Sequence, residues 1–388
     1  MKGNNMALYA GPISALKALF TFKPLVYGYS NARVRAMRTA LLSSRQAEDL
    51  LKVNTNAAVA EYLQRTTYRE DFTGMGANVN DEERVERAVS KNFARTAQKI
   101  LKITPEASKA TLLALLTRYD VLNLKTILLA RKLGRSKEET EKLLVPAGSI
   151  SREELFAMAS AKSADELYET IRASDFGKKF FSSTSVTQIS KAQIKTALQA
   201  SDDGKLELLV AALDSYYYYV ISSAVKAGDK DGEAILRLVR SETDAKNVIT
   251  CMRLKRGGAD KRAVMKCMVQ GGSFTNRQLE KMAGAKDIPE IANIAASFFI
   301  SETGRGDFAR AEERYKKDGQ ISHFEVVFEN SIARRSLHAL RRSMMSVGAI
   351  AGFLFLKEEE MNNIRKIVRG KALGLPAERI AEMLVLVG

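Results

Sequence analysis

The sequence predicts an all-α protein composed of three internal helical repeats. Apolar residues recur at spacings of three and four along most of the chain, and no segment keeps the two-residue alternation of a half-buried strand. Only six prolines occur in 388 residues, which favours long uninterrupted helices over a turn-rich β architecture. A short motif also recurs three times, and such self-similarity is typical of repeat proteins.

The repeated motif is an acidic residue, an asparagine three residues later, a glycine eleven residues after that, and a second glycine fourteen residues further on. The copies read Asp120, Asn123, Gly134 and Gly148; Asp244, Asn247, Gly258 and Gly272; and Glu360, Asn363, Gly374 and Gly388. The first two align without a gap at an offset of 124 residues, from position 120 to 167, with fifteen identical positions. Unrelated sequences would share roughly three over that length. We therefore expect one helical unit to have been copied twice.

The expected units follow one another along the chain. Residues 1–24 are interpreted as an N-terminal extension, and the three helical repeats are predicted to span 25–155, 155–279 and 279–388. The N-terminal part belongs to the first repeat in this interpretation, because the apolar spacing from residue 50 resembles that from residues 155 and 279.

The sequence also predicts two loops and one buried helical segment. Loops are expected at 72–80 and 304–319, where glycine and charged residues gather. The most apolar run, 347–356, is only about half as long as a membrane-spanning helix and predicts a buried helical segment.

The glycines and their neighbours predict where helices end and begin. Gly134 and Gly258 each follow a basic pair, which suits a helix C-terminus where a glycine adopts positive φ. A short helix is expected to follow, and Ser136, Asp260 and Pro376 mark its start in the three copies. Capping boxes then predict the next helix at Ser151-x-x-Glu154 and at Thr275-x-x-Gln278.

Four residues of each copy share one face when the motif is placed on a helix. They are the acid, the asparagine, the basic residue eight positions after the asparagine, and the first glycine. The three stripes are Asp120, Asn123, Arg131 and Gly134; Asp244, Asn247, Lys255 and Gly258; and Glu360, Asn363, Lys371 and Gly374. One interpretation is local: the amide bonds a neighbouring group and fixes the helix register. The other is that the stripes line a shared central cavity or a partner surface. Three equivalent copies without a nearby histidine do not suggest a catalytic site.

The formal net charge of +16 favours an acidic partner: nucleic acid, anionic lipid headgroups or an acidic protein surface.

The sequence lacks motifs that are typical of catalysis, nucleotide binding or metal binding. There is no phosphate-binding loop and no dinucleotide fingerprint after a strand. The two histidines, His323 and His338, and the two cysteines, Cys251 and Cys267, lack ligand spacing. We expect no catalytic residue, no cofactor and no metal site.

Several stretches resemble the C subunit of the archaeal and bacterial A/V-type ATP synthase. They are residues 27–37, 120–125, 352–354, 357–365 and 367–380. The resemblance covers the chain from about residue 27 onward. It implies a funnel-shaped, all-helical fold with pseudo-threefold symmetry and no nucleotide site.

The resemblance also implies a function. It implies a non-catalytic rotor subunit of the central stalk, in one copy per complex, peripheral to the cytoplasmic face of the cell membrane. Its partners would be the proteolipid ring and the central axle, subunits D and F, and it would couple the two during rotary ATP synthesis or hydrolysis and ion transport.

Two groups of residues are candidate contacts to these partners. Arg334, Arg335, Arg341 and Arg342 recur at i and i+7 on one predicted helix and would form a basic edge. That edge is either a solvated face or a surface that meets acidic ring loops or lipid headgroups. The second group is Tyr29, Arg33 and Arg35.

The alternative is a basic helical-repeat protein that binds nucleic acid, which the charge supports. Each stripe contains an acid, however, and no base-reading pair recurs at fixed positions. We therefore expect no nucleic-acid partner. An enzyme with a site between repeats is disfavoured because the sequence offers no nucleophile–base pair.

Overall fold

The computed structural model describes residues 23–75, 79–183, 189–199, 203–225, 230–342 and 345–386, and this part of the chain is helical without any strand. The expected all-α class is confirmed. Residues 1–22, most of the expected extension, and Gly388 lie outside the described residues. The N-terminal half contains α2 (Lys23–Arg38), α3 (Ser44–Lys52), α4 (Asn56–Gln64), the 3₁₀ helix η1 (Arg69–Phe72), α5 (Asp81–Ile103), α6 (Glu106–Lys132), α7 (Lys137–Leu143), α8 (Arg152–Ala159), α9 (Ala164–Ala173), α10 (Asp175–Ser182) and α12 (Lys191–Gln199). The C-terminal half contains α13 (Asp203–Ala224), α14 (Lys230–Arg256), α15 (Lys261–Lys266), α16 (Asn276–Ala283), α17 (Ile288–Asp318), α18 (Ser322–Arg342), α19 (Val347–Ala372) and α20 (Ala377–Met383).

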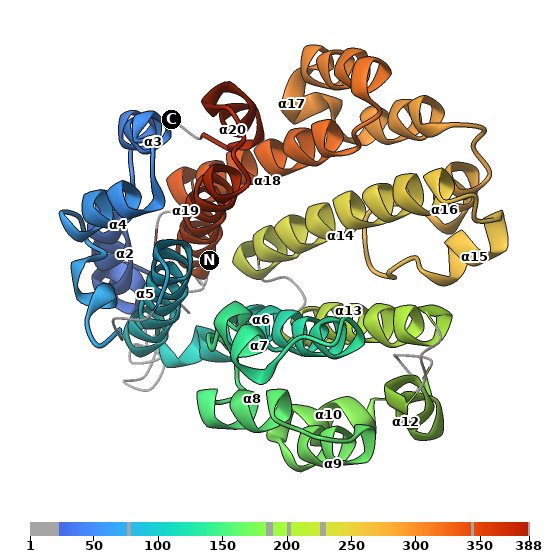
Figure 1. Ribbon diagram of the computed structural model, residues 1–388, viewed down its shortest axis with the longest axis horizontal. Coiled ribbons are helices and arrows are strands. Elements are labelled where there is room, and N and C mark those ends of the chain that lie inside the picture. The colour runs from blue at the N-terminus through green and yellow to red at the C-terminus, as the bar shows by residue number, and fades with distance from the viewer. Residues whose placement is uncertain are drawn as a thin grey trace, which may run out of the picture.

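Three long helices, α6, α14 and α19, carry the motif, and each packs against another long helix. Helix α6 packs on α13, α14 packs on α17 and α18, and α19 packs on α5 and α18. The partner of α19 thus includes a helix from the other end of the chain: α3, α4 and α5 lie beside α19 and α20 (Figure 1). The N-terminal helices therefore pack mainly with the third copy of the motif, and α5 also contacts α6 and α7 of the first.

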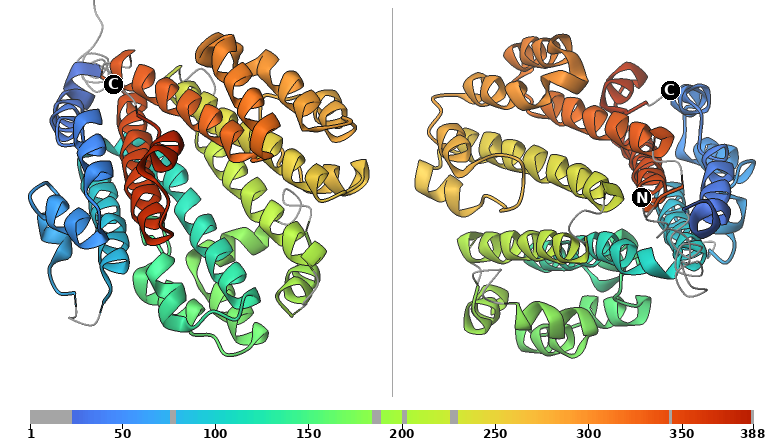
Figure 2. Two further views of the ribbon diagram at one scale, coloured as in Figure 1. Left: turned by 45° about the horizontal axis from the view of Figure 1, so that its top comes forward. Right: turned by 180° about the vertical axis from the view of Figure 1, so that it is seen from behind.

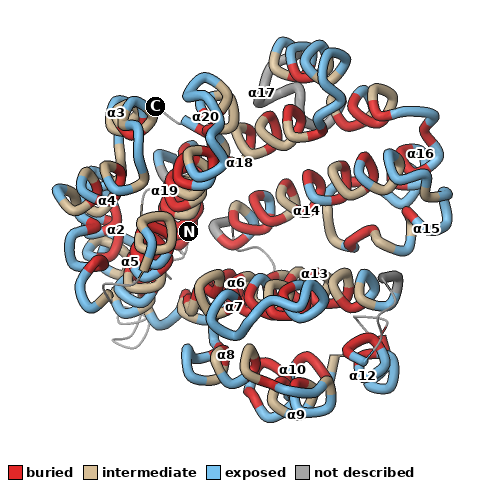
Figure 3. The backbone as a smooth tube through the Cα atoms, in the orientation of Figure 1, coloured by how far each residue is buried: buried red, intermediate tan, exposed pale blue. Residues whose placement is uncertain are grey.

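Buried apolar side chains form two clusters. The main cluster joins α2–α13, the first half of α14, the C-terminal end of α18, α19 and α20. The second joins the rest of α14, from Ala245 onward, to α15–α18. Buried residues follow one side of most long helices, whereas α19 is buried along much of its length (Figure 3). The apolar run 347–356 is buried throughout, as predicted. In the described ranges, no helix combines the length and apolarity that crossing a membrane needs.

The expected loop at 304–319 is wrong, because α17 continues as a helix to Asp318. Its charged residues form pairs along the helix, such as Lys316 with Glu312 at 2.7 Å, and no proline interrupts it. Such pairs at i,i+4 stabilise exposed helices. The helix ends at Gly319, whose φ of 68° makes it the left-handed cap.

The positions of the N-caps show how the N-terminal helices align with the helices that follow the first and second motifs. Successive N-caps are separated by twelve residues at three places: Ser43 and Thr55, Ser151 and Ser163, and Thr275 and Asp287. The capping boxes predicted at Ser151 and Thr275 are present, and Ser43 with Gln46 forms one at the equivalent place. Residue 43 therefore corresponds to residue 151, and the sequence-based alignment of residue 50 with 155 is three residues out of register. Apolar spacing repeats every three to four residues, so it tolerates a shift of that size.

Candidate functional site

The asparagine of each motif forms two hydrogen bonds with the backbone of a valine 22 residues later. Asn123 Nδ2 donates to the Val145 carbonyl at 2.8 Å, and its Oδ1 accepts from the Val145 N–H at 2.8 Å. The same two contacts, at 2.7–2.9 Å, join Asn247 to Val269 and Asn363 to Val385. All six residues are buried, so the amide satisfies two buried backbone groups in each copy. These contacts favour the local interpretation of the asparagine.

The acid of the first two motifs binds the backbone just before the next helix. Asp120 accepts hydrogen bonds from the N–H and hydroxyl of Ser149 and from the N–H of Ile150, all at 2.8 Å. Asp244 accepts from Ser273 N at 2.8 Å and from Phe274 N at 3.2 Å. Burial raises the pKa of both carboxyls, and the backbone donors oppose that shift.

The two glycines of the motif are needed for two different physical reasons. A Cβ at Gly148 would lie 2.2 Å from Asp120 Oδ1, and one at Gly272 would lie 2.0 Å from the corresponding oxygen of Asp244. These positions must be glycine because a carboxylate occupies the space. The earlier glycines have positive φ: 63° at Gly134 and 78° at Gly258, as predicted, and 68° at Gly374.

In the third motif the acid binds the opposite end of the chain. Glu360 Oε2 accepts from the Leu42 N–H at 3.3 Å, and Leu42 directly precedes the N-cap Ser43 of α3. Ile150 has the same place before the N-cap of α8. Glu360 Oε1 also accepts from Lys357 Nζ at 2.9 Å and from the Tyr68 hydroxyl. Sequence reasoning missed this contact because its partner lies more than 300 residues away.

The basic residue of the motif binds the other end of the same short helix. Arg131 donates to the carbonyl of Ala161, just after α8, at 2.8 Å. Lys371 donates to the carbonyl of Leu51 in α3 at 2.9 Å and to that of Val53. Lys255 is half-buried at the corresponding position. In the first and third copies, the acid therefore holds the N-terminal end of a helix and the cation its C-terminal end, which is the arrangement that the helix dipole favours.

The two groups of candidate partner contacts lie close together. Tyr29, Arg33 and Arg35 are exposed on α2, and Arg341 and Arg342 are exposed at the end of α18. Asn31 of α2 donates to the carbonyl of Ser346, in the segment that follows α18, at 3.3 Å. Residues of α2, α18 and α19 also line one cavity of about 510 Å³.

The expected exposure of the whole basic edge is wrong at Arg335. Its guanidinium donates to Ser241 Oγ of α14, and its side chain is half-buried. Arg334 pairs with Asp307 at 3.5 Å. One flank of α18 faces α14, so two cations with the same periodicity have different surroundings. The exposed cations of this edge are Arg334 and the pair at the helix end, Arg341 and Arg342.

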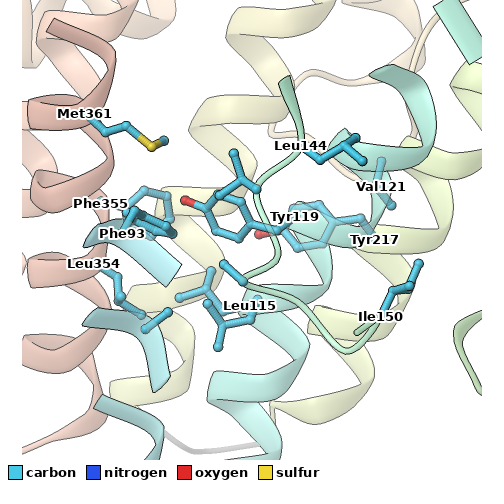
Figure 4. Packing of buried hydrophobic residues seen from close by; sticks show 14 of the residues in the cluster. Phe93, Leu115, Tyr119, Val121, Leu144, Ile150, Tyr217, Leu354, Phe355 and Met361 are labelled. Atoms are coloured by element: carbon cyan, nitrogen blue, oxygen red, sulfur yellow. The ribbon is translucent and has the colours of Figure 1, made fainter. Parts of the chain in front are cut away.

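A half-buried ion cluster at the meeting point of the three motif helices was missed by the sequence analysis. Arg118 of α6 lies between Glu242 of α14, at 2.9 Å, and Glu358 of α19, at 3.2 Å. Each of the three residues precedes its motif asparagine by five positions, which is the signal that could have revealed the cluster. The Arg118 guanidinium also lies 5.1 Å from the centre of the Phe355 ring. The packing of nearby apolar residues, including Phe355, Tyr119 and Tyr217, is drawn in Figure 4.

These features define an all-helical protein in which three long helices share one motif. The amide holds the segment that follows each helix, and the acid holds the start of another helix: α8 and α16 in the first two copies, and α3 in the third. No group of histidine, cysteine, aspartate and glutamate side chains in the described segments is arranged to hold a metal ion.

The chain matches the family described as ATP synthase (C/AC39) subunit over residues 30–383, and it belongs to that family. Its relatives include proteins named as the C subunit of the A-type ATP synthase. That of Thermoplasma acidophilum is 24% identical over 365 residues, covering 92% of this chain and 97% of the relative. That of Methanocaldococcus jannaschii is 25% identical over 360 residues, with 92% and 86% covered, and that of Methanosarcina barkeri is 26% identical over 367 residues, with 93% of each covered. The resemblance noted from the sequence is confirmed.

Proposed function

We propose that this protein is the non-catalytic rotor subunit of the central stalk in an A/V-type ATP synthase. In this role it is a socket, in one copy per complex, that couples the proteolipid ring to the axle subunits D and F. The observation that carries the proposal is the family match over residues 30–383, together with relatives named as the C subunit of the A-type ATP synthase. The protein would contribute to rotary ATP synthesis or hydrolysis and ion transport without binding nucleotide itself.

The packing suggests how such a socket is built. We propose three helical units around one axis, based on the pairs α6 with α13, α14 with α18, and α19 with α5, which would give the funnel its pseudo-threefold symmetry. In this arrangement the third unit contains α3–α5 from the start of the chain, held by the contact of Glu360 with Leu42. The sequence-based boundaries at 155 and 279 would then move. Close-packed helices deform little under load, which suits a part that transmits torque.

The basic end of the molecule is the proposed contact to the ring. Arg33 and Arg35 on α2 and Arg341 and Arg342 on α18 are exposed, and the Asn31–Ser346 hydrogen bond joins α2 to the N-cap of α19, a few residues after the end of α18. Cations at this position suit acidic ring loops or anionic headgroups at the cytoplasmic membrane surface, with the protein bound peripherally.

Charge reversal tests this contact. The variant Arg33→Glu/Arg35→Glu/Arg341→Glu/Arg342→Glu is expected to lose co-purification with the proteolipid ring while keeping its helical circular dichroism. The matched control reverses four exposed cations elsewhere: Lys99, Arg135, Arg262 and Arg277. Equal recovery of the ring with both variants would overturn the proposed surface.

Reconstitution tests the function itself. A complex that lacks this chain should hydrolyse ATP in its head without driving ion transport, and adding the purified chain should restore the coupling. Saturable ATP turnover by the purified chain, or full coupling in its absence, would refute a non-catalytic coupling role.

A further inference from the structure

The second apolar cluster is carried at the end of an arm of two helices. Helices α14 and α18 both run from the main cluster into the second one: α14 contributes Val239 to the first and Ala245 to the second, and α18 contributes Leu337 to the first and Phe328 to the second. Figure 1 and both views of Figure 2 show α14–α17 extending away from α5 and α19. We call the part from Ala245 to Ile332 the arm lobe.

Ion pairs join the arm to the main cluster at the level where the two clusters meet. Lys246 of α14 pairs with Asp214 of α13 at 2.9 Å, and Glu329 of α18 pairs with Lys366 of α19 at 2.7 Å. Further out, Asp318 of α17 pairs with Arg379 of α20 at 2.9 Å. A cavity of about 490 Å³ separates α12 and α13 from Met265, Lys266, Met268 and Gln270 of the lobe. These ion pairs add to the packing of α18 on α19 and of the Tyr218 ring against Gly271, and the cavity leaves open space beside α12 and α13.

The central ion cluster lies at the root of this arm. Glu242 lies near the middle of α14, between the residues of that helix that belong to the main cluster and those that belong to the second. Its partner Arg118 is on the side of the main cluster and is held there by Glu358 at 3.2 Å. The Arg118 guanidinium pairs with both carboxylates. Of the three equivalent positions 118, 242 and 358, only position 118 carries a cation, so the pairing of Glu242 within the cluster depends on Arg118.

We infer that the arm lobe is a hinged body and that Arg118 sets the angle at which the arm leaves the main cluster. Each cluster is close-packed, whereas among the described residues no buried apolar cluster spans the level at which α14 and α18 pass from one to the other, so this level is the weakest place for a change of angle. Loss of the Glu242–Arg118 contact removes the pairing of a largely desolvated charge at the hinge, which weakens the joint without opening either cluster. The inference goes beyond the proposed function and does not depend on it.

The test measures the distance between spin labels in the full-length chain, with Cys251→Ala and Cys267→Ser as background. One label at Glu313 on the lobe and one at Glu153 on α8 report the arm angle, and labels at Lys102 and Glu153 report the main cluster. Glu242→Gln and Arg118→Met are expected to broaden the first distribution and leave the second unchanged. Glu358→Gln is the matched control, because it changes the same guanidinium from the side of α19 and leaves Glu242 paired.

Amide hydrogen exchange provides a second test of the hinge. Amides near the middle of α14 should exchange at least about tenfold faster in Glu242→Gln than in Glu358→Gln, a factor that corresponds to about 1.4 kcal/mol. An unchanged label distance in both Glu242→Gln and Arg118→Met, or an equal change in Glu358→Gln, would overturn the hinge. Broadening of the control pair would overturn it as well, because the damage would then lie in the main cluster.

Discussion

The asparagine–valine contact allows the sharpest test of the motif. In Asn123→Leu the side chain keeps a similar volume but loses both hydrogen bonds, so the N–H and the carbonyl of Val145 remain buried without partners. Each orphaned group costs about 1–3 kcal/mol, so the expected loss is about 2–6 kcal/mol. A domain is stable by only about 5–15 kcal/mol, so this change is a large fraction of the total.

The three copies should not respond equally. Asn123 and Asn247 are each 1% exposed, whereas Asn363 is 8% exposed and, with Val385, lines the cavity of about 510 Å³. Water in that cavity can reach the orphaned groups of Val385 and replace part of what is lost. We therefore expect similar, large losses for Asn123→Leu and Asn247→Leu and a smaller loss for Asn363→Leu.

The assay is equilibrium unfolding in urea followed by far-ultraviolet circular dichroism, with the change in unfolding free energy taken from the midpoint and slope. Thr126→Ala on α6 is the control: its hydroxyl bonds the Leu122 carbonyl on the exposed side, so its loss should stay within about 0.5 kcal/mol. A loss below about 1 kcal/mol in Asn123→Leu would refute the reasoning, since the two backbone groups would then have found other partners.

Three further predictions rest on other contacts. Gly148→Ala should destabilise more than Gly134→Ala in the same urea assay, because its Cβ would meet the Asp120 carboxylate at 2.2 Å, whereas Gly134 has open space and only a positive φ, worth about 1–2 kcal/mol; equal losses would contradict this. Burial raises the pKa of Glu359 to about 8, so its folded form prefers the proton and unfolding free energy should fall as pH rises from about 4 through about 8; Glu359→Gln should flatten that slope, and an unchanged pH profile would show that the carboxyl titrates normally. Tyr68→Phe should cost about 1–3 kcal/mol, because it removes a buried hydroxyl that bonds an ion pair, and a neutral effect on thermal unfolding would mean that this contact is dispensable.

Much of the fold could be predicted from the sequence because its signals are local. A left-handed glycine, an N-cap and a capping box each involve residues within a few positions of one another, so Gly134 and the box at Ser151 occur in the structure where the sequence placed them. The motif also identified the three helices that carry the buried asparagines. The sequence predicted an amide within a packed face, and the structure shows that its partner is the backbone of a valine 22 residues later.

Two expectations from the sequence were wrong, the first for a local reason and the second because the neighbours come from another part of the chain. The charged composition of 304–319 suggested a loop, yet the pairs that its residues form along α17 keep it helical. Arg335 and Arg342 have the same periodicity, but only α14, packed on one flank of α18, decides that Arg335 turns inward to Ser241. Composition and periodicity do not contain that information.

The sequence by itself determined the helical class, the recurring acid–amide–glycine motif and the family. Only the tertiary structure decided that Glu360 binds Leu42 across the whole chain, and that Arg118 is shared by Glu242 and Glu358. The physical reason is that hydrogen bonds within a turn follow from residues close in sequence, whereas an ion pair between helices depends on how those helices cross. Packing sets that crossing through many weak contacts, none of which is visible in the order of the residues.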